Sequence, residues 1–325
     1  MAEEFLDRAR GSLVGLAVGD ALGSTFEFTS RPEVPDDLVM MGGGPFALEP
    51  GQWTDDTSLA LCLAESLILS GGFNPLDQMK RYARWLKFGH NSCRASGSGK
   101  RVFDVGIATR EAILLFVEGD CREPYCGSLD SNKAGNGSIM RLAPVPAYFA
   151  HDLKQAIMYS AESSKTTHGA PEAVSACAYL GALIWGALHG YTKEQLVGTA
   201  IFEPTPGLWR EYLLEPRIRE LASGEVLGLS EGKIRGTGYC VDTLKAALWA
   251  FVHTNDFQSG CIAAIRFGED TDTVAAVYGQ LAGAYYGESA IPPVWKSAIA
   301  RRELVYRLAD RIAADAASKL AHGAG

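Results

Sequence analysis

The spacing of apolar side chains along the chain is helical almost throughout. In residues 4–22, Phe5, Ala9, Leu13 and Leu16 fall on one face of a helix. Alternation with a period of two, the sign of a half-buried strand, is scarce. The chain is therefore predicted to be all-α. The same pattern predicts further helices over residues 57–70, 75–85, 103–117, 152–161, 171–189, 206–222, 239–253, 257–265, 273–286 and 294–320.

The order of these segments suggests one domain. No stretch between the predicted helices has the composition of a linker. Residues 30–51 and 121–138 are rich in glycine and proline and are predicted to be long loops. Long loops inside a compact domain are more often functional than idle. We therefore expect a compact single-domain helical bundle over residues 1–325.

Two of the predicted helices carry glycine at every fourth position. Glycine inside a helix costs about 0.8–1.0 kcal/mol relative to alanine, so a repeated glycine needs a compensating gain. Close approach of one helix backbone to another is the gain that we expect. The glycines of the first helix are Gly11, Gly15, Gly19 and Gly23, and those of the second are Gly279, Gly283 and Gly287.

Composition and charge narrow the possible functions. The net charge is -8, which argues against nucleic-acid binding because such proteins present a basic surface. The seven cysteines are odd in number and form no CxxC pair, so neither a zinc site nor a disulfide framework is predicted. The N-terminus has no apolar segment of a signal peptide, and Leu13–Leu22 is too short to span a bilayer. A cytoplasmic protein that acts away from membranes is expected.

Two dense acidic clusters each precede a predicted helix. Residues 54–57 read TDDT and residues 269–273 read EDTDT. Helix capping is one interpretation, because Ser, Thr and Asp are favoured at the N-cap. Capping explains one or two acids per helix but not two clusters of the same residue types. Adjacent carboxylates repel one another, and a bound cation would relieve that repulsion. We therefore favour metal binding over capping.

The residue types in these clusters indicate which metal. Carboxylate and threonine oxygens are hard donors, which suit magnesium, manganese or calcium rather than a thiophilic ion. Four aspartates with neighbouring threonines could hold two ions, which in two-metal sites lie about 3.5–4 Å apart and activate a water. Glu27, which follows the first glycine-rich helix, is a further candidate acid.

Three other segments hold candidate binding residues. Asn136 lies between Gly135 and Gly137, where backbone N–H groups could face an anion such as a diphosphate, although a plain turn is an equal alternative. His168 comes just before a predicted helix and could bind phosphate or cap that helix. Tyr239 could stack on a base or pack in the core.

The motifs together resemble those of the ADP-ribosylglycohydrolases, and most closely the bacterial type typified by dinitrogenase reductase-activating glycohydrolase. The matching segments run in family order over nearly the whole chain. One departure occurs before the last cluster, where the family often reads Gly-Gly-Asp and this chain has Gly268-Glu269-Asp270. The segments are GSLVGLAVGDALGSTFEF (11–28), GQWTDDTSLALCLAESL (51–67), VFDVGIATR (102–110), AGNGSIMRLAPVP (134–146), THGAPEA (167–173), GTGYCVDTLKAALWAF (236–251) and EDTDTVAAVYGQLAGAYYG (269–287).

The resemblance implies a compact all-α fold with two Mg²⁺ or Mn²⁺ ions. Glu27 matches an acid at the mouth of the site, and Asp104 matches a carboxylate near the ribose. The positions that match metal ligands are Thr54, Asp55, Asp56, Asp270, Asp272 and Thr273. The positions that match substrate-binding residues are Asn136, Gly137 and Ser138 at the diphosphate, His168 beside it and Tyr239 near the adenosine.

The expected reaction is hydrolysis of the bond between ribose C1 and a protein side chain, most readily arginine. The substrate would be an ADP-ribosylated protein and the product free ADP-ribose, through an oxocarbenium-like transition state. Candidates for the general base are Asp55, Asp104 and Glu27, and no covalent nucleophile is required. Three alternatives stay open: hydrolysis of serine-linked ADP-ribose, ADP-ribose binding without turnover, and cleavage of the diphosphate by a two-metal phosphoesterase.

Overall fold

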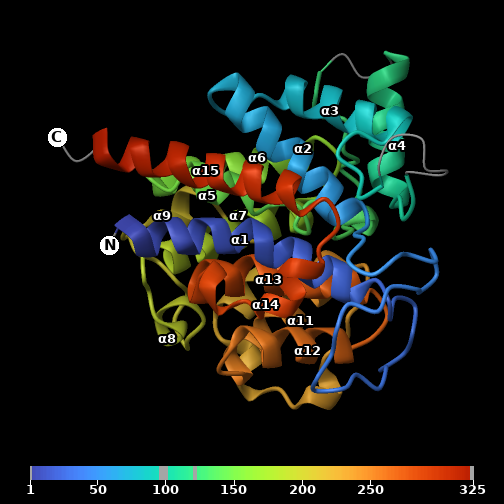
Figure 1. Cartoon of the computed structure of the whole chain (residues 1–325). Helices are drawn as coiled ribbons and strands as arrows, with labels where there is room; N and C mark the ends of the chain where they lie inside the picture. Colours follow the sequence, from blue (N-terminus) through green and yellow to red (C-terminus); the bar gives the residue numbers. More distant parts are fainter. Residues whose placement is uncertain (1, 95–101, 120–122, 323–325) are drawn as a thin grey trace.

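Two long antiparallel helices form the centre of the molecule in a computed structural model, which describes residues 2–94, 102–119 and 123–322. They are α1 (Ala2–Gly23) and α13 (Thr271–Tyr286), which lie side by side in Figure 1. Glycines bring their backbones together. A Cβ atom added to Gly15 would lie 2.3 Å from the carbonyl oxygen of Gly279, and one added to Gly279 would lie 2.1 Å from that of Gly15.

The other glycines at every fourth position of α1 keep the same register with α13. A Cβ on Gly11 would clash with the Gly283 carbonyl, one on Gly19 with Ala275 and one on Gly23 with residues 271–272. Each step of four residues along α1 is therefore matched by four residues backwards along α13. The predicted close backbone approach is confirmed, and the end of α1 lies against the start of α13.

The other helices surround this pair (Figure 1). The helix α15 packs against α1, and α2 and α5 pack against α15. The helices α7, α11 and α12 contact α13. The bounds of the helices are α2 (Asp55–Ser70), α3 (Pro75–Phe88), α4 (Ile107–Glu118), α5 (Pro144–Tyr148), α6 (Leu153–Lys165), α7 (Pro171–Leu188), α8 (Lys193–Leu196), α9 (Leu208–Glu211), α10 (Pro216–Ala222), α11 (Cys240–His253), α12 (Phe257–Arg266), α14 (Pro293–Ala298) and α15 (Arg302–His322).

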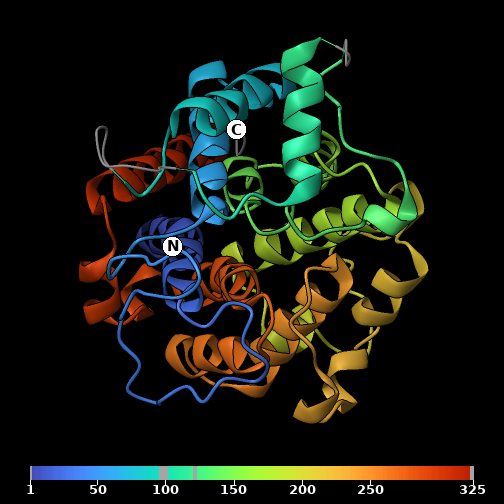
Figure 2. The same ribbon diagram turned by 90° about the vertical axis from the view of Figure 1, so that its right-hand side faces the viewer.

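The all-α prediction is confirmed for the described residues, where only isolated bridges occur in place of a sheet. Four short 3₁₀ helices fill some of the loops. Figure 2 views the molecule from the end where α1 finishes, and the long loop of residues 24–53 runs across this end. The 3₁₀ helices are Ser131–Lys133, Glu225–Gly228, Glu231–Lys233 and Glu288–Ala290.

Three predicted helix boundaries were wrong. Residues 206–222 form two short helices because Pro216 cannot continue the preceding one, and a residue before proline is biased away from helical geometry. Residues 294–320 are likewise divided, at residues 299–301, where Arg301 takes a left-handed φ of 45°. The helix predicted over 103–117 begins only at Ile107, so Asp104 lies in the preceding loop.

The cysteines and the apolar helices bear on the absence of a disulfide framework and of a membrane span. The described cysteines are buried and form no disulfide with one another, and Cys121 lies outside the described residues. Among those residues, α7 is the only helix long and apolar enough to cross a bilayer. However, 78% of it is buried inside the fold, as is usual for a core helix.

Candidate active site

The two acidic clusters meet where α1 ends and α13 begins. The hydroxyl oxygen of Thr54 lies 3.1 Å from Asp272 Oδ2, and that of Thr273 lies 3.4 Å from Asp56 Oδ1. The first cluster lies at the start of α2 and the second at the start of α13, more than 200 residues later in the chain. The helix packing therefore assembles a single acidic site from two distant segments.

Asp20, in α1, holds the first cluster in place and was missed as a site residue. One carboxylate oxygen accepts the backbone N–H and the hydroxyl of Thr54, both at 2.9 Å. The other accepts the same two groups of Thr57, at 2.9 and 2.6 Å. Asp20 is fully buried, so its position between Gly19 and Ala21 fixes residues 54–57 against α1. The only signal in the sequence is one acid within an apolar segment.

Helix capping does not account for the clusters. The N-cap residues of α2 and α13 are Thr54 and Asp270, and neither side chain makes a capping hydrogen bond. Elsewhere the chain caps in the ordinary way: Asn74, Asp152 and Asp256 each accept the N–H three residues ahead. Thr54 and Asp270 could cap their helices, but their side chains are directed away from the backbone N–H groups that a cap would bind.

The aspartates of the site are buried together and close enough to repel one another. Burial, followed by the charges of neighbouring acids, raises the pKa of Asp55, Asp56 and Asp272 well above its usual range. Asp56 Oδ2 and Glu27 Oε2 are buried with no hydrogen-bond partner among the described residues. A buried polar atom without a partner is costly. Such a cluster of hard oxygen donors could bind metal ions.

Asp104 and Glu27 join the cluster from two loops. Oxygen atoms of Glu27, Asp104 and Asp272 lie within 4.8 Å of one another. Burial, with the charge of Asp104 next, raises the pKa of Glu27 to about 9. Burial likewise raises the pKa of Asp104 to about 7. Asp104 has a left-handed φ of 51°, a conformation that Asp tolerates better than most residues.

A cavity of about 260 Å³ opens above these carboxylates. Its wall is formed by candidate acids, by the two glycines that flank Asn136 and by the His168 ring. Thr54, Asp56 and Asp272 lie beneath its wall and do not line it. The lining residues are Glu27, Phe28, Asp55, Asp104, Gly106, Ile107, Ala108, Thr109, Gly135, Asn136, Gly137, Met140, His168, Gly238, Asp270 and Thr273.

The side chains of Asn136 and Ser138 are occupied within the protein. Asn136 Nδ2 donates to Asp270 Oδ2 at 2.8 Å and to the hydroxyl of Thr243 at 2.9 Å. Ser138 is buried and accepts from the Ser164 hydroxyl. Asn136 thus positions an aspartate of the cluster, and the Ser138 side chain does not reach the cavity. The backbone N–H groups of Gly135 and Asn136 donate to the carbonyls of Lys133 and Gly238, so any anion contact from this loop would use the N–H of Gly137.

His168 is held by a short chain of hydrogen bonds. Arg141 Nη2 donates to the Thr167 hydroxyl oxygen at 2.6 Å, and that hydroxyl lies 2.8 Å from His168 Nδ1. If the hydroxyl donates to Nδ1, the ring carries its proton on Nε2. Burial, with the Arg141 charge, lowers the pKa of His168 to about 3, so the ring is neutral. Gly137 makes room, since a Cβ there would lie 2.7 Å from the ring.

Tyr239 lines a second cavity, of about 890 Å³, which adjoins the first. The two cavities share Ile107, Ala108, Gly135 and Gly238 in their walls. The Tyr239 hydroxyl donates to Glu172, so the ring is fixed at the edge of this space. The long continuous hollow has carboxylates at one end and an aromatic ring at the other.

Comparison with known proteins agrees with this geometry. The family model of the ADP-ribosylglycohydrolases matches residues 1–321. The chain belongs to the ADP-ribosylglycohydrolase family. It is 42% identical to the ADP-ribosylarginine hydrolase Tri1 of Pseudomonas putida, over 95% of this chain and 79% of the relative. It is 33% identical to the ADP-ribosyl-[dinitrogen reductase] glycohydrolase of Rhodospirillum rubrum, over 90% of both chains.

A solved structure shares the fold of this glycohydrolase. That structure, an ADP-ribosylglycohydrolase-related protein complex, is 41% identical and superposes with a TM-score of 0.81, covering 97% of this chain and 99% of that one. The resemblance read from the seven motifs is therefore confirmed at the level of the family and of the fold.

Glu269 is the point where this glycohydrolase departs from the Gly-Gly-Asp pattern. Its φ is 63°, in the left-handed region that favours glycine, which gives a physical reason for glycine at this position. Backbone hydrogen bonds to Phe28 and Thr29 hold the residue there. Its side chain points outward and pairs with Arg235 at 3.0 Å. Glutamate in place of glycine at position 269 therefore changes the edge of the site and leaves Asp270 in position.

Proposed function

We propose that this chain hydrolyses the bond between ADP-ribose and an arginine side chain, with two bound Mg²⁺ or Mn²⁺ ions. The observation that carries the proposal is the convergence of both acidic clusters, with unpartnered buried oxygens, beneath a cavity lined by the 135–137 loop and His168. The identity of 42% to a relative named ADP-ribosylarginine hydrolase supports the linkage.

The donor set fits the proposed ions. Their ligands would come from both clusters, and bound ions would offset the repulsion that, after burial, raises the pKa of Asp55 and Asp56. Hard divalent ions supply charge that orients ribose hydroxyls and lowers the pKa of a water. The residues that would hold them are Thr54, Asp55, Asp56, Asp270, Asp272 and Thr273.

The remaining carboxylates would act on the substrate directly. Asp55, Asp104 and Glu27 all face the cavity, and each is a candidate to take the proton of the attacking water. A carboxylate on the same wall also stabilises positive charge that develops on the ribose ring in the transition state. We find no need for a covalent nucleophile, because water attack completes the hydrolysis.

The adjoining cavities offer a path for the rest of ADP-ribose. The diphosphate would meet the backbone N–H of Gly137 and the Nε2–H of His168. The adenosine would extend into the second cavity toward Tyr239. Bound cations would favour the ionised form of Asp104 and its acidic neighbours at the mouth, and these carboxylates would then attract a guanidinium leaving group, which is a cation. This attraction favours arginine over serine, although solvent screens it outside the cavity.

One experiment tests the proposal against its alternatives. Matched peptides, one ADP-ribosylated at arginine and one at serine, are incubated with the protein in chelator and then in excess Mg²⁺ or Mn²⁺. Mass spectrometry identifies both products. We expect free ADP-ribose and unmodified peptide, faster from the arginine peptide, and only with added metal.

The other outcomes have distinct meanings. AMP as product would assign diphosphate cleavage, and binding without product would assign a recognition module. A faster rate on the serine peptide would overturn the arginine linkage while leaving the metal chemistry in place. Full turnover in demonstrably metal-free protein would overturn the proposed mechanism.

A further inference from the structure

A third cavity, of about 680 Å³ and lined mainly by polar residues, lies away from the acidic site. It is bounded by the end of α3, the loop that follows it and the start of α15. Its volume is in the range of pockets that take small ligands. The lining residues are Glu65, Arg84, Phe88, Gly89, His90, Asn91, Arg94, Arg301, Leu304 and Arg307.

Four arginines line this cavity, and three of them have no acidic partner among the described residues. Among the described residues, no carboxylate oxygen lies within 4.0 Å of a guanidinium nitrogen of Arg84, Arg301 or Arg307, whereas Arg81 and Arg311 on the same helices, α3 and α15, are each paired with an acid. Burial, together with the positive charge of Arg307, lowers the pKa of Arg301. Like charges around one hollow repel, and a bound anion would remove that repulsion.

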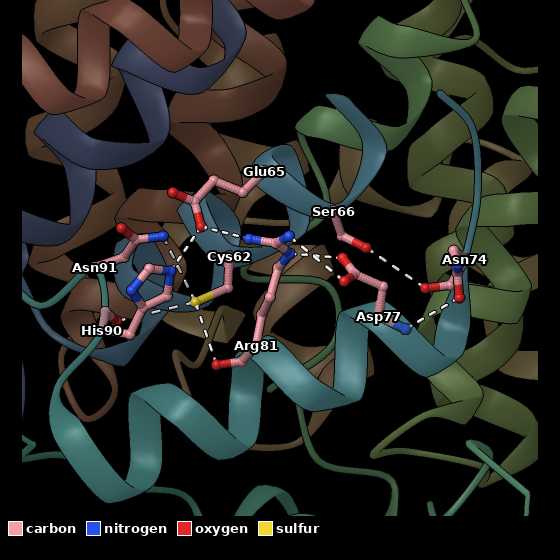
Figure 3. Close-up of polar contacts among 8 residues, drawn as sticks. All are labelled: Cys62, Glu65, Ser66, Asn74, Asp77, Arg81, His90 and Asn91. Atoms are coloured by element: carbon pink, nitrogen blue, oxygen red, sulfur yellow. Dashed lines mark hydrogen bonds and ion pairs between the residues drawn. The ribbon is translucent and has the colours of Figure 1, made fainter. Parts of the chain in front are cut away.

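Glu65, the one acid among the described residues of the wall, already accepts hydrogen bonds from two partners. Its Oε2 accepts from Arg81 at 2.8 Å and from the His90 ring at 2.6 Å, as Figure 3 shows. Burial works against its charge, but these partners hold the pKa of Glu65 below its usual range. Arg81 also binds Asp77, so its own charge is shared. The remaining arginines therefore dominate the potential inside the cavity.

Arg301 is held in the wall of this cavity. Arg301 has a left-handed φ of 45°, which is unfavourable for a non-glycine residue. One guanidinium nitrogen donates to the Ser92 carbonyl at 2.6 Å, which fixes the side chain over the loop after α3. Arg301 also directly precedes α15, a helix of 21 residues whose positive N-terminal end favours anions.

The cavity is separate from the candidate active site. Glu65 lies ten residues along α2 from Asp55, and a helix rises 1.5 Å per residue, so the two positions are roughly 15 Å apart. None of its lining residues lines the cavity above the aspartates. An anion bound here would not be the diphosphate of a substrate in the acidic site.

We propose that this cavity binds the phosphate chain of a small polyphosphate, such as tripolyphosphate or a nucleoside triphosphate. Guanidinium groups match phosphate oxygens in pairs, and several of them around one hollow suit a chain of phosphates better than a single carboxylate. Phe88, half exposed at the edge, offers a surface on which a base can stack.

The test is calorimetric titration of the full chain with tripolyphosphate and with ATP, both in chelator so that metal-mediated binding at the acidic site is absent. The variants are Arg84→Gln and Arg307→Gln. The matched control is Arg311→Gln, one turn further along α15, where Arg311 pairs with Asp315 at 2.8 Å. We expect saturable binding that either pocket variant weakens about tenfold, the effect of one lost charge-assisted hydrogen bond.

The control should bind like the parent protein, and all three variants should keep the parent's unfolding temperature and rate on ADP-ribosylated peptide. Equal affinity for both probes would assign recognition to the phosphates alone. Tighter ATP binding, reduced by Phe88→Ala, would add a base contact. No saturable binding, or equal weakening by Arg311→Gln, would overturn the proposal.

Discussion

Asp20 and Thr54 are joined by two hydrogen bonds, one to the backbone N–H and one to the hydroxyl of Thr54, both to the same carboxylate oxygen. The second oxygen of Asp20 binds Thr57 in the same way. This carboxylate connects the central helix pair to the loop that carries the first acidic cluster. The position of the cluster therefore depends on a residue that need not touch substrate.

Asp20→Asn should disrupt this connection. The amide nitrogen would face two donors that have lost their acceptor, and leaving two buried donors unpaired costs about 3 kcal/mol or more. We expect a lower unfolding temperature together with weaker Mg²⁺ binding. Asp7→Asn is the control, because Asp7 lies on the same helix and binds exposed Ser289. Unchanged metal affinity in Asp20→Asn would show that residues 54–57 hold their geometry without it.

Asp56→Asn and Asp272→Asn should remove activity while the protein still folds. In chelator each variant should be at least as stable as the parent protein, because one of several mutually repelling carboxylates is gone. Excess Mg²⁺ should raise the unfolding temperature of the parent, since a ligand that binds the folded state stabilises it, and should raise that of the variants less. Differential scanning fluorimetry and the peptide assay measure both effects.

The control for this pair is Asp256→Ala. Asp256 is an ordinary N-cap, so its loss should cost about 0.5–2 kcal/mol of stability and leave turnover and the Mg²⁺ response unchanged. Near-normal turnover in Asp56→Asn or Asp272→Asn at saturating metal would contradict a ligand role for that residue.

The helical fold and the helix pair at its centre could be predicted from the sequence because both depend on local rules. Apolar periodicity defines a helix within one segment, and glycine at every fourth position signals close backbone contact. Gly15 and Gly279 meet as that pattern indicates. Helix ends were less predictable. The break before α15 depends on Arg301, which has a left-handed φ and whose hydrogen-bond partner, Ser92, lies far away in the chain.

The direction of side chains in the site could not be predicted. The motifs indicated which segments contribute, but Asn136 and Ser138 turn to Asp270 and Ser164, contacts that only the tertiary structure creates. Asp20 was missed because a lone acid in an apolar helix has no pattern. Its function depends on four donors that lie more than 30 residues away.

The glycine contact predicts a large effect of one methyl group. Gly279→Ala would put its Cβ 2.1 Å from the Gly15 carbonyl oxygen, so the two helices must separate. We expect a loss of more than about 3 kcal/mol, at the upper end for overpacking, or no soluble protein. Gly72→Ala is the control, because a Cβ there meets nothing within 4 Å, and its stability should change by less than about 1 kcal/mol. Denaturant unfolding compares them.

The burial of His168 predicts a specific dependence of stability on pH. Its pKa is lowered to about 3 in the folded protein from an ordinary value of 6.5. Between these values the unfolded chain binds a proton that the folded protein does not, so the His168 contribution falls as pH falls, by about 1.4 kcal/mol per unit. His168→Gln removes this contribution to the pH dependence of stability. The stability difference between parent and variant should therefore move by about 2 kcal/mol in favour of the variant from pH 6.5 to pH 5. Because the acids of the site titrate in both proteins, only the difference between their unfolding curves is diagnostic.

The ring carbon signal of His168, assigned by its absence in the variant, should stay constant from pH 5 to pH 8. A signal that titrates near pH 6.5 would show that the ring can take up a proton in the folded protein, and a charged rather than neutral imidazole would then face the diphosphate.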